Sequence, residues 1–510
     1  MSTIIIGGGL GGLVCGAALS RSGESVTLFE QHSVVGGYAT TYKRNGHLIE
    51  GGLHQMDGLD EWDLKTDILG ELGALDGVEW IKTPEFNQVI HGDSSFIIPS
   101  GRAAVEEAFC SKFPAEAPAI RRFLGDLYAI RRELQSFYPT LYPSPSLATR
   151  LRMLSYPFRF PKIVTYLSKT LGNVLDRSFK SEELKLLFAS CLGYYHDNPH
   201  ELAMVYYGIG TGSYLEGGGH FVKGGSQRLS DYLRGVIEQH GGTVRTNRRV
   251  SGIERRGDRV VAVHVSDKDG ETTRHEADRV VANTSPINAL AMLGDAQEIS
   301  DAEKATQPAP RERDRVPSSV PPGPSLLSLW YVFNRPLPEL GSSSYSTFVL
   351  DPEVRRLSQF KLYPDTAPTY FMLCDYAHID SGLGEPAVAV ATIDHASRWK
   401  TLNSTEYAAM KQTELDAYLE KIDRLYPGAK AELTYAEAAT PLTMQRYTEN
   451  PEGAVYGSVQ TPPFAGPKRE RAWPEIPGLY YASAWGFPGG GFTGGILSGY
   501  LAARRILQRR

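Results

Sequence analysis

Residues 3–30 read TIIIGGGLGGLVCGAALSRSGESVTLFE. The β-branched run at 3–6 predicts a short buried strand, and the small and apolar residues at 13–21 predict a helix that packs closely on a sheet. Gly23 stands where helices commonly end on glycine, and residues 26–30 predict the next strand. A strand, a glycine turn, a helix and a second strand make a βαβ unit, so this stretch predicts an α/β fold with a parallel sheet.

The turn at residues 7–12 contains the pattern G-x-G-x-x-G in Gly7, Gly9 and Gly12. Gly7 permits the tight turn, Gly9 lets the backbone approach a pyrophosphate, and Gly12 lets the helix lie close to the strand. Leu10 and Gly11 lie in the same turn, and the N-terminus of the helix that follows presents free N–H groups and a positive dipole end to the phosphates. Because the motif lies between a predicted strand and a helix, it favours a dinucleotide site over a glycine turn without a ligand.

Glu30 ends the second predicted strand and Gln31 follows it. A carboxylate at that position can accept hydrogen bonds from both ribose hydroxyls of an adenosine, and it repels a 2′-phosphate. The pair Gly36-Gly37, followed by Tyr38 and Ala39, comes shortly afterwards, and such a pair is typical of FAD enzymes rather than of plain NAD dehydrogenases. We therefore predict that the chain binds FAD, with Gln31, Gly37, Tyr38 and Ala39 beside it.

The composition excludes several other classes of protein. A net charge of -5 gives no electrostatic reason to expect nucleic acid as a partner. Four scattered cysteines, none at CxxC spacing, predict no metal site and a reducing compartment. No run of about 18 apolar residues predicts a spanning helix, and the glycine-rich start without a positive region argues against a signal peptide. We expect a cytoplasmic protein, which leaves peripheral membrane attachment open.

The rest of the chain predicts a second, interleaved unit. Helical spacing dominates residues 75–200, a helix, strand, hairpin and strand follow at 221–283, and residues 326–450 mix strands with a long helix at 404–425. Residues 301–325 are rich in proline and charge and predict an exposed loop. We predict a Rossmann-type FAD-binding domain from residues 1–75, 221–300 and 451–510, and a substrate domain of mixed sheet and helices from 76–220 and 301–450.

Three further segments carry a family resemblance: GHLIEGGLH at 46–54, VKGGSQ at 222–227 and LYYASAWGFPGGGFTGG at 479–495. With the N-terminal glycine block, they make nearly the whole chain resemble the carotenoid desaturase and isomerase family and its relative retinol saturase, within the larger amine-oxidase-like flavoproteins. The resemblance implies that the last segment is a strand, a glycine-rich loop and a helix from 494 to 508 that approach the flavin ring.

The resemblance also implies roles for single residues. Gly491, Phe492 and Thr493 are expected at the flavin ring, where a helix start stabilises negative charge in the reduced state. Val250 is expected to contact the adenine through its backbone. Two positions depart from the desaturase pattern: Tyr38 stands where many desaturases have arginine, and His54 is closer to the saturase and isomerase branch.

Catalytic residues are harder to predict, because enzymes of this family move a hydride between substrate carbon and flavin, and the protein mainly positions the two. His54 and Glu50 follow the flavin-side loop and are candidates, although a hydrogen-bonded structural role fits both. Trp485 and Phe487 precede the flavin loop and are candidates for lining a substrate channel, with aromatic core packing as the alternative.

The predicted substrate is a long apolar polyene or isoprenoid, and desaturation, saturation and isomerisation stay open. A quinone or another electron partner fits this chemistry. Residues 150–169 mix aromatic and aliphatic side chains with cations and suit peripheral membrane contact, or a helical cap with solvated charges. Two other functions remain: an amine oxidase acting on a tailored metabolite, and a prenyl-binding scaffold like the GDP-dissociation inhibitors of small GTPases.

Overall fold

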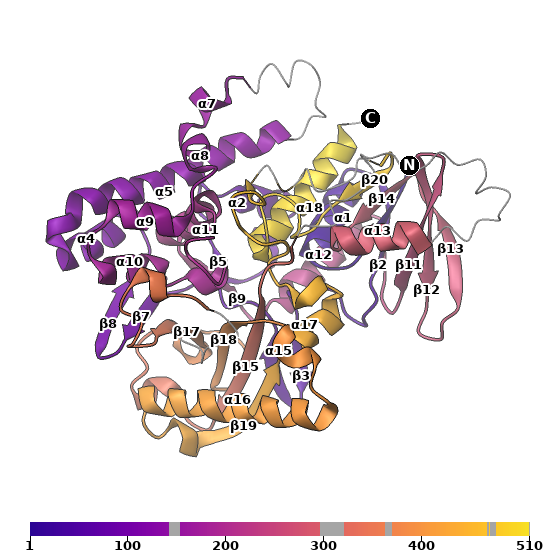
Figure 1. Ribbon diagram of the computed structural model, residues 1–510. Helices are drawn as coiled ribbons and strands as arrows, with labels where there is room; N and C mark the ends of the chain where they lie inside the picture. Colours follow the sequence, from indigo (N-terminus) through magenta and orange to yellow (C-terminus); the bar gives the residue numbers. More distant parts are fainter. Residues whose placement is uncertain (142–153, 296–320, 363–369, 467–468, 470–475, 509–510) are drawn as a thin grey trace.

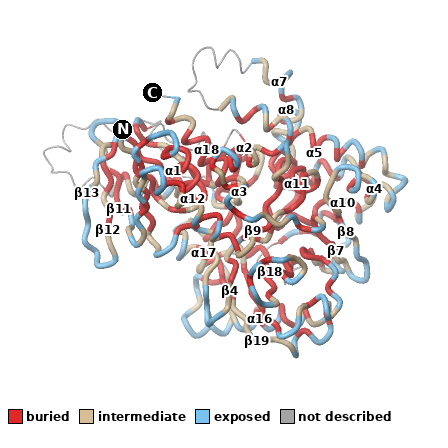
Figure 2. Tube along the Cα trace, turned by 180° about the vertical axis from the view of Figure 1, so that it is seen from behind, coloured by how far each residue is buried: buried red, intermediate tan, exposed pale blue. Residues whose placement is uncertain are grey.

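The computed structural model describes residues 1–141, 154–295, 321–362, 370–466, 469 and 476–508. Figure 1 shows three neighbouring regions: a parallel sheet with its helices beside both chain ends, a second sheet backed by a long helix, and a group of helices at the far side from the termini. Buried residues run through all three regions, as Figure 2 shows: one hydrophobic cluster extends across them, and two smaller clusters lie under α16 (Ser404–Leu425) and under the antiparallel sheet of residues 249–276.

The parallel sheet is assembled from three separate parts of the chain. Its five strands lie in the order β10-β2-β1-β14-β20, and every neighbouring pair is parallel. The strands are β1 (Ser2–Ile6), β2 (Ser25–Phe29), β10 (Thr243–Arg245), β14 (Arg279–Ala282) and β20 (Leu479–Tyr481). Because parallel strands expose their carboxyl ends at one edge, the turns after β1, β2 and β14 meet there.

Both faces of this sheet are covered. Helices α1 (Leu10–Arg21), α12 (Gln227–Gln239) and α18 (Gly491–Leu507) pack together on one face, where Ile5 and Val281 point. The antiparallel sheet β11 (Arg249–Arg256), β12 (Arg259–Ser266) and β13 (Thr272–Glu276) covers the other face with α13 (Pro286–Asp295). Ile4 and Ile6 point to that second face, which explains why the strand is apolar at every position.

The second sheet has seven strands in the order β19-β15-β18-β17-β16-β7-β8. Neighbours are antiparallel except β16 and β7, which are parallel. The strands are β7 (Asn87–His91), β8 (Ser94–Ile98), β15 (Ser325–Phe333), β16 (Ser346–Leu350), β17 (Tyr370–Asp375), β18 (Ala387–Asp394) and β19 (Leu433–Ala439). Helix α16 (Ser404–Leu425) covers one face, where Leu327 and Tyr331 point, while Trp330 points to the opposite face.

The helices of the third region pack around α11 (Met204–Gly217) and α5 (Ala117–Phe137). The others are α4 (Arg102–Lys112), α7 (Tyr156–Arg159), α8 (Pro161–Tyr166), α9 (Leu171–Ser178) and α10 (Glu182–Ala189). Small elements join the regions: β3 (Thr41–Arg44), β4 (His47–Glu50), β5 (Met56–Asp57), α2 (Leu64–Glu71), α3 (Ala74–Gly77), β6 (Trp80–Lys82), β9 (Gly219–Val222), α15 (Ser397–Lys400) and α17 (Pro441–Thr448).

The α/β class and the N-terminal βαβ unit are confirmed, although the helix of that unit begins at Leu10 rather than at residue 13, and three further expectations need correction. The last helix begins at Gly491 rather than at residue 494, so the predicted flavin loop is partly the first helical turn. Residues 87–98 form the hairpin β7–β8 inside a stretch expected to be mostly helical, because its strands are short and joined at Gly92-Asp93. The β-strand expected at 479–483 ends at Tyr481.

Two expected surface segments are described in part. Residues 301–320 of the proline-rich segment lie outside the described residues, but Gly323, Pro324 and Ser325 are buried as the chain enters β15. In the segment 150–169, residues 150–153 lie outside the described part, whereas Leu154 and Phe158 are exposed and Phe160 is buried. Within the described residues, no helix combines the length and the hydropathy needed to cross a bilayer.

Candidate active site

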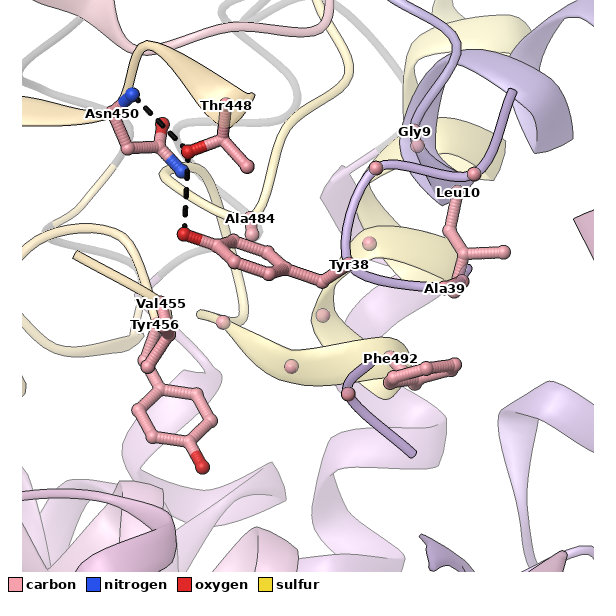
Figure 3. Close-up of a pocket in the computed structure, with 18 of the residues that line it drawn as sticks. Gly9, Leu10, Tyr38, Ala39, Thr448, Asn450, Val455, Tyr456, Ala484 and Phe492 are labelled. Atoms are coloured by element: carbon pink, nitrogen blue, oxygen red, sulfur yellow. Dashed lines mark hydrogen bonds between the residues drawn. The ribbon is translucent and has the colours of Figure 1, made fainter. Parts of the chain in front are cut away.

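One large cavity lies where the carboxyl edge of the parallel sheet meets the seven-stranded sheet and α11. We call its two parts the cofactor half and the substrate half. The cofactor half is lined by the β1–α1 turn, the ends of β2 and β14, the start of β11 and the start of α18. The substrate half is lined by β15, β17, β18, α11 and the segment at 194–195. Figure 3 shows the junction of the two halves around Tyr38 and Phe492.

The glycine turn has no room for side chains. A Cβ on Gly11 would lie 2.1 Å from the carbonyl oxygen of Ala482, and one on Gly12 would lie 2.2 Å from that of Gly7. Gly9 is the N-cap of α1, so the free N–H groups of the first helical turn face the cavity that Gly9, Leu10 and Gly11 line. This is a cradle of the size and polarity that a pyrophosphate needs.

Asn283 packs against the glycine turn, and it was not among the site residues predicted from the sequence. Its side-chain amide donates a hydrogen bond to the carbonyl oxygen of Gly7 over 3.1 Å, and it lies against Gly9, Gly11 and Gly12. The residue directly follows β14, so the sheet itself delivers it to the turn. The sequence did offer one indication of this role, because Asn283 is a polar residue at the end of a buried strand.

Glu30 lies at the far end of the cofactor half. Its carboxylate accepts hydrogen bonds from the backbone N–H of Gly8 at 2.7 Å and of His32 at 2.9 Å. Gln31 and Val250 line the cavity beside it. Each carboxylate oxygen keeps a lone pair for a ribose hydroxyl, so these residues fit the adenosine end of FAD.

Tyr38 crosses from the cofactor half to the opposite wall. Gly36 pairs with Gly9 in an isolated bridge, which brings Gly37, Tyr38 and Ala39 into the cavity lining. The Tyr38 hydroxyl lies 3.2 Å from the Thr448 hydroxyl of α17, and Figure 3 draws this hydrogen bond as a dashed line. The side chain that replaces the arginine of many desaturases is therefore a neutral hydrogen-bonding group, whose pKa is raised by burial.

The start of α18 closes the cofactor half from the other side. Gly491, Phe492 and Thr493 form its first turn and line the cavity. Gly499 is packed so tightly on α1 that a Cβ would lie 2.3 Å from the carbonyl oxygen of Gly11. The free N–H groups of this turn supply the positive dipole end expected beside a flavin ring.

The three candidate catalytic residues all line the cavity, but their contacts differ. His54 lies beside Tyr194, with ring centroids 6.5 Å apart, and burial lowers the pKa of His54 to about 4, so its imidazole is neutral near pH 7. Trp485 is buried and its indole N–H donates to the Asn450 side chain at 2.9 Å.

Glu50 is held as a structural carboxylate would be. It accepts hydrogen bonds from the N–H and hydroxyl of Ser226, both at 2.7 Å, from the Leu53 N–H at 2.8 Å and from the Thr41 hydroxyl at 2.7 Å. Burial raises its pKa, and these donors oppose that rise. Phe487, the further aromatic candidate, is buried against Phe137.

The substrate half is walled by aromatic and aliphatic side chains. Those from α11 and the neighbouring loops are Tyr194, Tyr195, Tyr206, Ile209, Tyr214 and Tyr456, and those from the second sheet are Leu326, Trp330, Met372, Ala389 and Val390. Burial raises the pKa of the Tyr194, Tyr195 and Tyr214 phenols well above the usual value, so these walls are uncharged. Nothing in the sequence marks scattered tyrosines as one wall.

Asp57 is the charged residue that the sequence reasoning missed at this junction. It lines the cavity, and its carboxylate contacts Thr493 of α18 and the buried Lys65. The described residues hold no group of His, Cys, Asp and Glu side chains arranged to bind a metal ion.

Comparisons with known proteins agree with this geometry. Residues 10–507 match the family model described as flavin containing amine oxidoreductase. All-trans-retinol 13,14-reductase of Danio rerio is 24% identical over 490 residues, which cover 90% of this chain and 77% of the reductase. The chloroplastic prolycopene isomerase of Arabidopsis thaliana is 23% identical over 525 residues, covering 99% of this chain and 82% of the isomerase. An oxidoreductase from Methanosarcina mazei shares the fold, with a TM-score of 0.61, 18% identity and full coverage of both chains.

Proposed function

The chain belongs to the family of flavin-containing amine oxidoreductases, and from this premise we propose that it transfers hydride between FAD and a carbon–carbon double bond system of a long apolar polyene. It is an FAD-dependent enzyme of the carotenoid- and retinoid-related type. The observation that supports this substrate class best is the uncharged tyrosine and aliphatic wall of the substrate half.

We propose that the cofactor half holds FAD from both ends of the chain. Glu30, Gln31 and the backbone of Val250 would hold the adenosine, the turn with Gly7, Gly9, Leu10, Gly11 and Gly12 the pyrophosphate, Gly37, Tyr38 and Ala39 the neighbouring part, and Gly491, Phe492 and Thr493 the flavin ring. When bound, FAD supplies the hydride acceptor or donor.

The same arrangement supports the proposed division of the chain. All five strands of the parallel sheet fall in residues 1–75, 221–300 and 451–510, and all seven strands of the second sheet fall in 76–220 and 301–450. We propose that the first set is the FAD-binding domain and the second set is the substrate domain.

The chain's own residues would bind, orient and exclude water rather than exchange protons. Two described carboxylates line the cavity beside the substrate half: Glu50 accepts hydrogen bonds from five donor groups, and Asp57 accepts them from Lys65 and Thr493. Hydride transfer to a polyene carbon depends on approach and alignment, which Trp330 and the tyrosine walls would impose. The neutral His54 and Trp485 are then wall residues that would contact substrate.

The alternative of amine oxidation stays testable. A cationic amine would gain from a free carboxylate in the substrate half, and both described carboxylates there are already bound by the chain itself. The prenyl-binding scaffold is not proposed, because the family and the cavity both fit a flavin enzyme.

The decisive experiment uses the purified holoprotein under anaerobic conditions. The reduced and oxidised forms are incubated with all-trans-retinol, prolycopene and a partly saturated carotene, and products are analysed by mass spectrometry. A gain of two hydrogens indicates saturation, a loss indicates desaturation, and unchanged mass with altered retention indicates isomerisation. Hydrogen peroxide produced from amines, with every polyene unchanged, would overturn the proposal.

Ala389→Leu is the matched variant for this experiment. Ala389 lies on β18, opposite Trp330 in the neighbouring strand, and both line the substrate half. A larger side chain there should occupy substrate space without touching the glycine turn. We expect normal FAD content and at least tenfold lower kcat/KM for the polyene, as for loss of about 1.4 kcal/mol of substrate fit.

We also propose a place in the cell and an electron partner. Leu154 and Phe158 are 73% and 88% exposed, in a segment that also carries Arg159 and Lys169. Apolar side chains beside cations suit contact with an anionic bilayer surface, where a lipophilic substrate and a quinone would be found. We therefore propose a cytoplasmic protein that attaches peripherally to a membrane, with a quinone or a similar carrier as its electron partner.

A further inference from the structure

Asp57 stands at the meeting point of the two halves of the cavity. It belongs to the short strand β5, and its carboxylate accepts hydrogen bonds from the Thr493 hydroxyl at 2.5 Å and from the Lys65 ammonium at 3.1 Å. The Asp57 side chain is 10% exposed, toward the cavity that it lines. This carboxylate therefore joins the first turn of α18 to a buried cation.

Lys65 is an unusual residue to find inside a protein. Its side chain is 1% exposed, and its ammonium also donates to both oxygens of Asp63, at 3.0 and 2.8 Å. Burial would lower the pKa of Lys65, but Asp57 and Asp63 outweigh burial and raise it. Burying a charge is costly unless it is paired, so Lys65 is held in place by two carboxylates.

Two carboxylates, those of Asp57 and Asp63, share the ammonium group of Lys65. Asp63 is also the N-cap of α2, where it accepts the Lys65 backbone N–H at 2.8 Å. Arg131 lies 3.8 Å from Asp63, but it is bound to Asp60 and Glu216 at 2.7 and 2.8 Å. Asp57 is the carboxylate of this pair that faces the cavity, and its charge lies against the first turn of α18.

Asp57 also sets the polarity of Thr493. Burial would raise the pKa of the Asp57 carboxyl, but Lys65 and the hydrogen bonds of Thr493 and Ser213 lower it, so the carboxyl is ionised. An ionised carboxylate only accepts hydrogen bonds, so the Thr493 hydroxyl must donate its hydrogen to it. The Thr493 oxygen can then act toward the cavity only as an acceptor.

We propose that Asp57, held by Lys65, is a positioning residue that lowers the reduction potential of the bound FAD, both by its charge and by fixing Thr493 as an acceptor. The proposal rests on the FAD site of the proposed function. A negative charge near the flavin opposes the negative charge that two-electron reduction brings to the ring. The dipole of α18 acts in the opposite direction, so Asp57 moderates it.

A purely structural role predicts something different. If the cluster only anchored α18, replacing Asp57 would weaken folding and FAD binding but leave the potential of the retained FAD unchanged. The reduction potential therefore separates the two interpretations, and its measurement needs no substrate.

The first test is Asp57→Asn in the holoprotein, reduced together with a reference dye. We expect the ratio of reduced to oxidised FAD at a fixed applied potential to rise by on the order of tenfold, because a unit of negative charge is removed. Asp126→Asn is the control: Asp126 is a buried carboxylate paired with Lys162 at 2.6 Å, and it does not line the cavity. It should leave the ratio unchanged.

The second test leaves every charge in place and changes the link. Thr493→Val should raise the ratio of reduced to oxidised FAD by about threefold, a smaller change than for Asp57→Asn because the carboxylate remains. Thr493→Ser keeps the hydroxyl and should restore the wild-type ratio. The two Thr493 variants also test the proposal if Asp57→Asn does not fold.

The outcomes separate this proposal from the proposed function. A wild-type protein that binds no FAD would defeat both. Normal FAD binding with the wild-type ratio in Asp57→Asn, or in Thr493→Val if Asp57→Asn does not fold, would overturn the role of Asp57 alone and leave the polyene chemistry standing.

Discussion

The two halves of the cavity differ in whether backbone or side chains form their walls. In the cofactor half the backbone of the glycine turn forms part of the wall, because Gly9 and Gly11 line the cavity and a Cβ on Gly11 would lie 2.1 Å from the Ala482 carbonyl oxygen. In the substrate half large side chains form the wall, with Tyr194, Tyr214 and Trp330 buried in their own packing. A backbone wall suits one unvarying ligand, since any substitution disturbs it, whereas a side-chain wall can be reshaped residue by residue. The difference predicts that substitutions in the first half cost the cofactor and those in the second half change the substrate.

The largest expected effect is that of Gly11→Ala. Its Cβ would lie 2.1 Å from the backbone oxygen of Ala482, which cannot rotate away. We expect a loss of more than about 3 kcal/mol in the free energy of unfolding, at the upper end of overpacking costs, and a colourless purified protein.

Gly235→Ala is the control for that variant. Gly235 lies inside α12, and a Cβ there meets no atom within 4 Å. Alanine should stabilise this helix by up to about 1 kcal/mol. Denaturant unfolding and absorbance of bound FAD measure both variants, and a yellow, stable Gly11→Ala protein would break the comparison.

Glu30→Gln should have the next largest effect. Glutamine keeps one acceptor oxygen for the two backbone N–H groups of Gly8 and His32, so a buried hydrogen bond is lost. We expect FAD affinity, measured by fluorescence quenching, to fall about tenfold, as for a loss of roughly 1.5 kcal/mol. The exposed Glu61, changed to Gln, should bind FAD normally; equal effects at both positions would contradict a specific role for Glu30.

His54 predicts a pH effect that belongs to the substrate half. Burial lowers its pKa to about 4 from an ordinary value of 6.5. Between these values the unfolded chain binds a proton that the folded chain does not, so stability falls as pH falls from about 6.5 to about 4. His54→Phe should remove about 1–3 kcal/mol of this loss.

His220 provides a second histidine for the same measurement. Its pKa is also lowered to about 4, by burial and by Lys82 and Lys65. Urea unfolding between pH 4 and 7 should show a slope that each single substitution reduces by about one proton. An unchanged slope in His54→Phe would mean that its imidazole is protonated or freely hydrated in the folded protein. FAD content at pH 7 should stay normal in this variant.

The smallest effect on stability is expected at Phe158, outside both halves. Its side chain is 88% exposed, so Phe158→Ser should change the free energy of unfolding by less than about 0.5 kcal/mol. Sedimentation with anionic lipid vesicles should nevertheless decrease. Ile97→Ser, at a position 48% exposed on β8, is the control that should not alter sedimentation; if both variants sediment like the wild type, this face does not bind the membrane.

The contrast between the halves also explains what the sequence could predict. Glycines at fixed spacing between a strand and a helix are constrained by geometry alone, so Gly7, Gly9 and Gly12 indicated the turn and its ligand without a structure. Tyr194, Trp330 and Ala389 come from distant parts of the chain and meet only through the seven-stranded sheet and α11. No local pattern marks them.

Asn283 and the Asp57–Lys65 contact also depend on the tertiary fold and could not be predicted from a local pattern. Asn283 was visible as the end of a predicted strand, but its place under the glycine turn depends on the parallel register of β14 with β1. The Asp57–Lys65 contact joins two short elements whose sequences look like ordinary polar loops. The start of α18 was placed three residues late, because glycines 489–495 resemble a loop and become helical through packing on α1.

The packing of α18 on α1 has a consequence for biosynthesis. Gly11 is synthesised long before residues 491–507, so it meets Gly499 only after that helix has been made. Until then the nascent chain has one wall of its cofactor site, an unpaired edge on β14 and an exposed face on α1. The cofactor half of the cavity therefore cannot be complete before α18 has been synthesised.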